Sequence, residues 1–107
     1  MQRIRLTQND NDVKFIFNIK KDGIVETILG ATIEFQLEGS ESGRKICREC
    51  EITDANSGEC MYSFTTEDLS VPDTYMSEIQ ITYSNGTKLT HRNPVVVIVI
   101  PEVVICN

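Results

Sequence analysis

The chain has 107 residues, of which 16 are acidic and 10 basic, and its net charge is -6. Nucleic acids and anionic membranes both favour a basic protein face, so this balance argues against either partner. The length suits one domain, which we place over residues 1–107. The longest apolar run is residues 95–100, far shorter than a membrane-spanning helix, which needs about 20 residues. The first residues carry no apolar stretch typical of a secretory signal, so none is expected.

Residues that favour strands recur in short stretches separated by turn formers, a spacing typical of an all-β sandwich. Within these stretches apolar and polar residues alternate, so one face of each strand should be buried. Residues 24–29 are interpreted as a short extended link, and residues 39–43 as an exposed loop, because they hold two glycines and no apolar side chain. In the first part of the chain the expected strands are residues 3–7, 13–19 and 31–37, and the expected turns are residues 9–12 and 21–23.

The central part of the chain is expected to form a hairpin, with residues 45–53 and 59–65 as its arms and the polar residues 54–58 as its turn. Residues 66–69 favour one helical turn, since a threonine hydroxyl can cap free amides and acidic residues suit a helix start. Pro72 then ends this turn. The side chains expected to face one another across the core are Ile46, Cys50 and Ile52 on one arm and Cys60, Tyr62 and Phe64 on the other.

Asn85 and Gly86 form a strong signal for a second hairpin. A two-residue loop would set Ile81 opposite Thr90, whereas a three-residue loop sets Ile81 opposite Leu89 and keeps apolar side chains together. We therefore predict a type I turn with a bulge at Gly86.

The last strands flank a proline. After the strand at residues 74–83 and the hairpin, residues 92–94 should interrupt the return strand, because Pro94 lacks the amide that a central ladder needs. Residues 95–100 then resume the strand, and so apolar a run implies burial on both faces or a contact with another chain. Within residues 101–107 the segment 103–105 is still apolar, so we expect this domain to be the N-terminal part of a longer protein.

Shared parity along each strand predicts the core, because a shift of one residue would turn these side chains to the wrong face. Tyr75 stands at a corner, where its hydroxyl is expected to bond back to the backbone of residues 69–73, as a corner tyrosine does in related sandwiches. The predicted core comprises Phe15, Phe17, Ile33, Phe35, Leu37, Ile52, Tyr62, Phe64, Ile79 and Ile81.

The four cysteines are the only group with obvious chemical potential. Cys47 and Cys50 have the C-x-x-C spacing of a zinc knuckle, which Cys60, Cys106 or His91 could complete. No Gly or Pro bends this segment, however, and in a strand the two sulfurs would point to opposite faces about 10 Å apart, too far for a disulfide. We expect unpaired cysteines and no metal site; a zinc site and a Cys50–Cys60 disulfide are the alternatives.

The other polar motifs are interpreted as structural. His91, the only histidine, lies on a strand without a serine elbow, phosphate loop or metalloprotease motif, and is expected to be a satisfied surface residue. Residues 9–12 offer oxygen ligands but lack the glycine and distant glutamate of a calcium loop. Residues 85–87 fit a glycosylation sequon, which the hairpin already explains. We expect no catalytic, cofactor-binding or metal-binding residue.

The order of features along nearly the whole chain resembles the N-terminal immunoglobulin-like domain of phage baseplate upper proteins. Residues 29–35 (LGATIEF) and residues 73–79 (DTYMSEI) are similar to two stretches with which alternating strands begin in that family, although Asp73 and Thr74 stand where a glycine is usual. The other matching features are the opening strand at residues 3–7, the strand and turn at 15–23, residues 52–58 leading into 62–64, the turn at 67–69 and the hairpin at residues 85–86.

The resemblance implies an immunoglobulin-like two-sheet antiparallel β-sandwich with a structural role and no enzymatic activity. Such a domain would anchor a receptor-binding appendage to the tail baseplate of a phage or prophage. Its partners would be other baseplate or tail proteins, with homo-oligomers of the full-length protein as a further option. It would reside in the virion and assemble in the bacterial cytoplasm, where unpaired cysteines persist. No cofactor, nucleic acid or membrane is implied.

Two functions of other classes compete with this one. A cell-surface immunoglobulin-like adhesion module would require a signal peptide and a wall anchor in the full gene. A small zinc or thiol-redox protein would use the cysteines. Gene neighbourhood separates the phage protein from the adhesin, and metal analysis with a free-thiol count addresses the third function.

Overall fold

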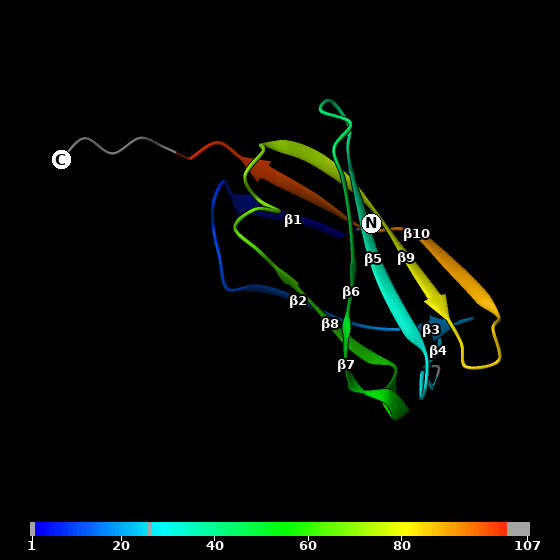
Figure 1. The fold of residues 1–107 in the computed structure, drawn as a ribbon. Coiled ribbons are helices and arrows are strands. Elements are labelled where there is room, and N and C mark those ends of the chain that lie inside the picture. Colours follow the sequence, from blue (N-terminus) through cyan, green and yellow to red (C-terminus); the bar gives the residue numbers. More distant parts are fainter. Residues whose placement is uncertain (1, 26, 103–107) are drawn as a thin grey trace.

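The computed structural model describes residues 2–25 and 27–102, apart from the side chains at positions 93 and 94 (Figure 1). The fold is all-β, as predicted, and includes a short 3-10 turn, η1 (Ala55–Ser57). Within this part of the chain, no helix is long and apolar enough to cross a membrane. Residues 103–105 and Cys106, which the sequence singles out, lie outside the described residues. The strands are β1 (Gln2–Thr7), β2 (Val13–Asn18), β3 (Lys20–Lys21), β4 (Ile24–Val25), β5 (Thr32–Gly39), β6 (Lys45–Glu49), β7 (Glu51–Asp54), β8 (Glu59–Phe64), β9 (Asp73–Thr82) and β10 (Lys88–Ile100).

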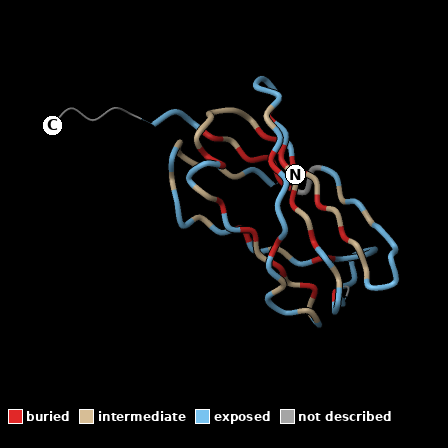
Figure 2. The backbone as a smooth tube through the Cα atoms, viewed as in Figure 1, coloured by how far each residue is buried: buried red, intermediate tan, exposed pale blue. Residues whose placement is uncertain are grey.

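The strands form three sheets, and aromatic side chains of the two larger sheets pack against each other. The five-stranded sheet has the order β1-β10-β9-β5-β6, the three-stranded sheet has the order β2-β8-β7, and β3 pairs with β4. The ring centroid of Phe35 on β5 lies 4.6 Å from that of Tyr62 on β8 and 5.9 Å from that of Phe15 on β2. Figure 2 shows the buried segments in the interior, on strands of both sheets.

The expectation of a purely antiparallel arrangement is wrong for one pair of strands. β1 runs parallel to β10, from Gln2 opposite Val95 to Thr7 opposite Ile100. Parallel strands cannot be joined by a tight turn, and here nearly all of the described chain lies between them. Alternation predicts the strand at residues 3–7, but it carries no information on the direction of a partner so distant in sequence.

The first arm of the central hairpin, expected as one strand over residues 45–53, is two strands in different sheets. β6 pairs with β5, whereas β7 pairs with β8, where Ile52 lies opposite Cys60. The change of sheet occurs at Cys50, whose amide donates to the carbonyl of Ile33 at 2.7 Å. Both strands turn apolar residues toward the same core, so alternation does not reveal the switch. The hairpin itself is confirmed for β7, η1 and β8.

The C-terminal hairpin has the predicted three-residue loop. Ile81 pairs with Leu89, the amide of Gly86 donates to the carbonyl of Tyr83 at 2.9 Å, and the amide of Tyr83 donates to the carbonyl of Thr87 at 2.8 Å. Gly86 has a φ of 88°, in the left-handed region that favours glycine. The predicted register and the special role of Gly86 are therefore confirmed.

The predicted interruption of the return strand is a bulge within β10. The register against β9 shifts between Arg92 and Val96. Ser77 of β9 is buried at this point, and its hydroxyl donates to the carbonyl of Val95 and accepts the amide of Val95 at 3.1 Å. A side chain thus satisfies backbone groups that the shifted ladder leaves without a strand partner.

The predicted core is confirmed, with Phe17 and Ile52 at its half-buried margin. The prediction missed some core residues, and Ile28 is the clearest example. Residues 24–29, interpreted as an extended link, contain β4 and then Ile28, which is fully buried. A single apolar residue in a segment without alternation carries no signal for a face, so Ile28 could not be identified from the pattern.

The connection between β8 and β9 holds the corner tyrosine as predicted. Tyr75 is buried, and its hydroxyl donates to the carbonyl of Val71 at 2.6 Å. Residues 66–69 form a turn rather than a helix. The threonine cap expected there is that of Thr65, whose hydroxyl accepts the amide of Asp68 at 3.1 Å.

Candidate protein-binding surface

The described cysteines do not form a reactive cluster. Cys47 is exposed on β6, whereas Cys50 and Cys60 are buried, and all three are free. Burial, reinforced by nearby anionic groups, raises the pKa of both buried thiols to about 12. The thiolate is the form that binds metals and attacks disulfides, so these two thiols are inert at neutral pH. Among the residues described, no group of three or more metal-ligating side chains is found.

His91 is not the satisfied surface residue that the sequence suggests. It is half-buried, and its buried Nε2 atom has no hydrogen-bond partner among the described residues. It lines a cavity of about 230 Å³ together with Phe15, Phe17 and Ile79. The residues lining that cavity include no serine or cysteine. His91 is two residues from Leu89, so both side chains lie on the inner side of β10. A single histidine in a polar stretch of sequence does not indicate this orientation.

The two asparagine-containing turns have the structural role expected of them. The carboxylate of Asp10 accepts the amide of Thr7 at 3.1 Å, and the amide of Asp10 donates to the carbonyl of Thr7 at 3.1 Å. The side-chain oxygen of Asn85 accepts the amide of Thr87 at 2.9 Å. In both turns a short polar side chain bonds to neighbouring backbone, which is how such residues stabilise turns.

The outer face of the five-stranded sheet, which points away from the core, combines apolar and charged side chains. Each strand contributes every second residue to this face. One neighbouring row contains Arg5, Ile98 and Thr74, and another contains Glu78, Gln36 and Cys47. The register aligns one complete row across all five strands, consisting of Arg3, Val96, Met76, Glu38 and Lys45.

An apolar stripe, defined as Met76, Val96, Ile98 and Ile100, lies within the outer face on β9 and β10. Met76 is 37% and Ile100 is 42% exposed, whereas Val96 is buried. The opposite side of β10 packs into the core. The apolar run at residues 95–100 is therefore internal on one side and partly open on the other.

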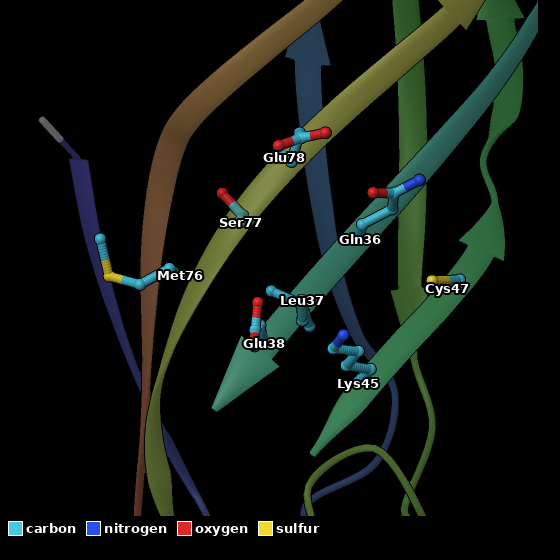
Figure 3. A pocket seen from close by; sticks show the side chains of 8 residues that line it. All are labelled: Gln36, Leu37, Glu38, Lys45, Cys47, Met76, Ser77 and Glu78. Atoms are coloured by element: carbon cyan, nitrogen blue, oxygen red, sulfur yellow. The ribbon is translucent and has the colours of Figure 1, made fainter. Parts of the chain in front are cut away.

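Charged side chains border the apolar stripe. Arg3 and Arg5 of β1 lie exposed along one side. On the other side a hollow of about 270 Å³ lies over β5, β6 and β9, and Glu38 and Lys45 are at one end of it (Figure 3). Small-molecule sites are mostly apolar and enclosed, whereas an apolar centre with a polar rim is typical of protein interfaces. The hollow is lined by Gln36, Leu37, Glu38, Lys45, Cys47, Met76, Ser77 and Glu78.

The loop between β5 and β6 is fixed by Asp73, the first residue of β9. The Asp73 carboxylate accepts the hydroxyl and the amide of Ser42 at 2.7 and 2.9 Å and the amide of Thr74 at 2.7 Å. These hydrogen bonds, with that of the Ser42 hydroxyl as the largest, lower the pKa of Asp73 to about 2. A Cβ atom added at Gly39 would lie 2.3 Å from Asp73 Oδ2, so the Asp73 carboxylate would have to move away from its present position. We call Asp73 and its hydrogen bonds to Ser42 and Thr74 the clamp. The clamp fixes the loop that leads into Lys45 at the end of the hollow.

A buried carboxylate holds the connection beside β6. Asp68 is 2% exposed and forms an ion pair with Arg48. It also accepts the hydroxyl of Tyr62 at 2.9 Å and the amide of Thr65 at 2.9 Å. Arg44 donates to the carbonyl of Asp68 at 2.8 Å. Within the turn, Thr65 and Asp68 bond reciprocally, as the T-x-x-D spacing of a capping box favours. The links from Asp68 to Arg48 of β6 and Tyr62 of β8 join separate strands, and no local motif indicates them.

Comparison with known families identifies the family of this chain. The family model described as the BppU N-terminal domain matches residues 1–102, which is nearly the whole chain. A search of curated proteins finds no match. The chain therefore belongs to the family of N-terminal domains of BppU, the baseplate upper protein, and is a structural protein associated with phage baseplates.

Proposed function

We propose that this domain anchors a receptor-binding appendage to the phage tail baseplate through protein contacts of its outer face. The observation that carries the proposal is the apolar stripe bordered by Arg3 and Arg5 on one side and by the hollow on the other. Family membership supplies the baseplate setting.

The composition of this surface suits a protein partner. Met76 and Ile100 offer exposed apolar area, and methionine and arginine are both enriched in protein interfaces. The cations at Arg3 and Arg5 would orient an acidic partner before contact. Because the stripe lies on paired strands, a partner would meet a surface that needs little ordering on binding.

The proposal extends to the whole protein. Residues 1–107 form one immunoglobulin-like sandwich, supported by the aromatic packing between the sheets and by the Tyr75 corner. In this proposal the domain is the N-terminal part of a longer, non-enzymatic virion protein that assembles in the bacterial cytoplasm. Its partners are other baseplate or tail proteins.

The test uses the full-length protein in phage particles. Met76→Glu combined with Ile100→Glu should lower incorporation into purified tails by about tenfold, because central apolar anchors dominate interface energy. Ile16→Glu is the matched control, since Ile16 is 58% exposed on β2, in the other large sheet. Quantitative mass spectrometry of tails measures the incorporation.

Deleting residues 1–107 should abolish incorporation altogether. Normal incorporation of that deletion would overturn the anchoring function. Loss in the deletion together with normal incorporation of the double variant would move the contact away from the outer face. Turnover of a substrate by the isolated domain would contradict the non-enzymatic role.

A further inference from the structure

One stretch of sheet edge is left open by the way the first strand is placed. β1 pairs with the second half of β10 only, beginning at Gln2 opposite Val95. Residues 88–92 pair with β9 on one side, and no strand among the described residues pairs with their other side. We name residues 88–92 the open edge. In an antiparallel pair, alternate residues of such an edge direct their N–H and C=O groups outward, where they can bind another strand.

A cavity lies beside the open edge. It has a volume of about 230 Å³, and it is lined by Phe15, Phe17 and Ile79, with Lys20 also in its wall. The rings of Phe15 and Phe17 stack with their centroids 5.1 Å apart. The volume is below the roughly 300–1,000 Å³ of small-molecule sites. The cavity therefore suits one large apolar side chain better than a cofactor.

His91 gives independent support for an occupant. It lies on the open edge and in the cavity wall, and its Nε2 atom is buried without a hydrogen-bond partner among the described residues. Buried polar atoms are nearly always satisfied in folded proteins. An unpartnered atom at the mouth of an aromatic cavity is what a strand or side chain arriving from outside would satisfy.

The charge around the open edge selects the kind of strand. Lys88 and Arg92 lie exposed along it, and Lys20 lies across the cavity, in a chain whose net charge is -6. Glu78 faces Arg92 at 3.9 Å between Oε2 and Nε. Cations on an edge disfavour pairing with an identical edge of a second copy, whereas they attract an acidic segment.

We propose that the open edge binds an extended acidic segment of a partner protein as an additional strand, which places one aromatic or large aliphatic side chain in the cavity. Main-chain hydrogen bonds to residues 88–92 supply affinity, and the cavity supplies specificity at one position of the segment. The added strand continues the line of β1 along the same side of β10. This site is separate from the apolar stripe and does not depend on it.

The test uses the domain and a fluorescent probe peptide, Glu-Val-Glu-Phe-Glu-Val-Glu, whose apolar residues share one face and whose acids share the other. The first control peptide carries lysine in place of every glutamate. The second control keeps the side chains of the probe, but the backbone amides along one of its edges are N-methylated and cannot donate hydrogen bonds. Fluorescence anisotropy measures affinity, and amide hydrogen exchange maps the site. The acidic peptide should bind at least about tenfold more tightly than either control and slow the exchange of amides within residues 88–92.

Charge-reversal variants locate the contact on the protein. Lys88→Glu with Arg92→Glu should weaken the acidic peptide by about tenfold or more. Lys14→Glu with Lys21→Glu, at exposed cations that line neither the cavity nor the hollow, has the same net charge and should bind as the wild type does. Thermal unfolding of each variant verifies that the fold is retained.

Three outcomes would overturn the proposal. They are the absence of binding, equal binding of the acidic and N-methylated peptides, and exchange protection that maps outside residues 88–92. Concentration-dependent dimerisation that protects the same amides without peptide would also overturn it, because the occupant would then be a second copy. None of these measurements involves the apolar stripe, so the anchoring function stands or fails separately.

Discussion

Asp68 and Asp73 stand near the two ends of the connection between β8 and β9, and each holds a different segment: Asp68 holds that connection itself, whereas Asp73 holds the loop between β5 and β6. Asp68 is almost fully buried and has a cationic partner, Arg48, in addition to a hydroxyl and an amide. Asp73 lies at the surface, and its hydrogen bonds come from neutral donors, chiefly those of Ser42. A carboxylate that loses its water needs charged compensation, whereas one at the surface keeps water as a further partner. Burial should therefore decide the energetic weight of each group more than the number of its bonds.

The largest expected effect is that of Asp68→Ala. Its free energy of unfolding should fall by about 3 kcal/mol, because Arg48 loses its partner and the buried hydroxyl of Tyr62 loses its acceptor. Urea denaturation measures the change. Glu67→Ala, at an exposed neighbour, should stay within about 0.5 kcal/mol of the wild type. Equal losses in the two variants would remove the distinction between buried and exposed acids.

Gly39→Ala tests how tightly the surface clamp is packed. The new Cβ would lie 2.3 Å from Asp73 Oδ2 and 2.4 Å from Ser42 Oγ, so these two side chains must move and their hydrogen bonds must rearrange, with a loss of about 2 kcal/mol. In an Asp73→Ala background the same change should cost less, because one of the two clashing groups is gone. A double-mutant cycle by thermal unfolding measures this coupling, and strictly additive losses would mean that the cost of the methyl group does not come from its contact with Asp73.

Tyr75→Phe and Tyr62→Phe compare a hydrogen bond to a neutral carbonyl with a hydrogen bond to a charged carboxylate. Removing the hydroxyl that bonds to Val71 should lower stability by about 0.5–1.5 kcal/mol. Tyr62→Phe removes a bond to the carboxylate of Asp68 and should cost about 1.5–3 kcal/mol. Chemical denaturation of both variants gives the comparison. A larger loss for Tyr75→Phe would show that the charge of Asp68 adds nothing to its bond.

The smallest expected effect is the pH dependence contributed by Asp73. Folding lowers the pKa of Asp73 from its ordinary value of 3.8 to about 2, chiefly through the Ser42 hydroxyl. The stabilisation is fully present above the ordinary value and is lost as the pH falls through the lower one. The stability difference between wild type and Asp73→Asn should therefore shrink as the pH falls from about 4 to about 2. A difference that stays constant over this range would contradict the role of the ionised carboxylate.

Local patterns predict which side of a strand is buried. Phe35 and Tyr62 are core residues that the sequence predicts correctly. Their burial could be predicted because alternation within one strand depends only on neighbouring residues. The loop at Gly86 follows from a register that keeps Ile81 beside Leu89. The corner bond of Tyr75 follows from its place at the start of a strand. Each of these features is encoded within a short stretch of sequence.

Features that join distant segments could not be predicted in this way. The change of sheet at Cys50 keeps the same inward parity, so the pattern is identical on both sides of it. The apolar stripe depends on Met76 meeting the outer side of β10, which the register decides. His91 lines a cavity together with Gln2, the first residue of β1, and no feature near His91 in the sequence indicates where β1 lies.

The parallel pairing of β1 with β10 has a consequence for synthesis on the ribosome. β10 lies between β1 and β9 in the sheet, yet it is the last of the described strands to be translated. Until it emerges, β1 has no neighbour in its sheet and β9 has an uncovered edge. Contacts between the two ends of a chain also slow folding, because a long loop must close before they form. The nascent domain therefore remains incomplete until residue 100 has left the ribosome, and during that interval the exposed edge of β9 is the segment most in need of protection from aggregation.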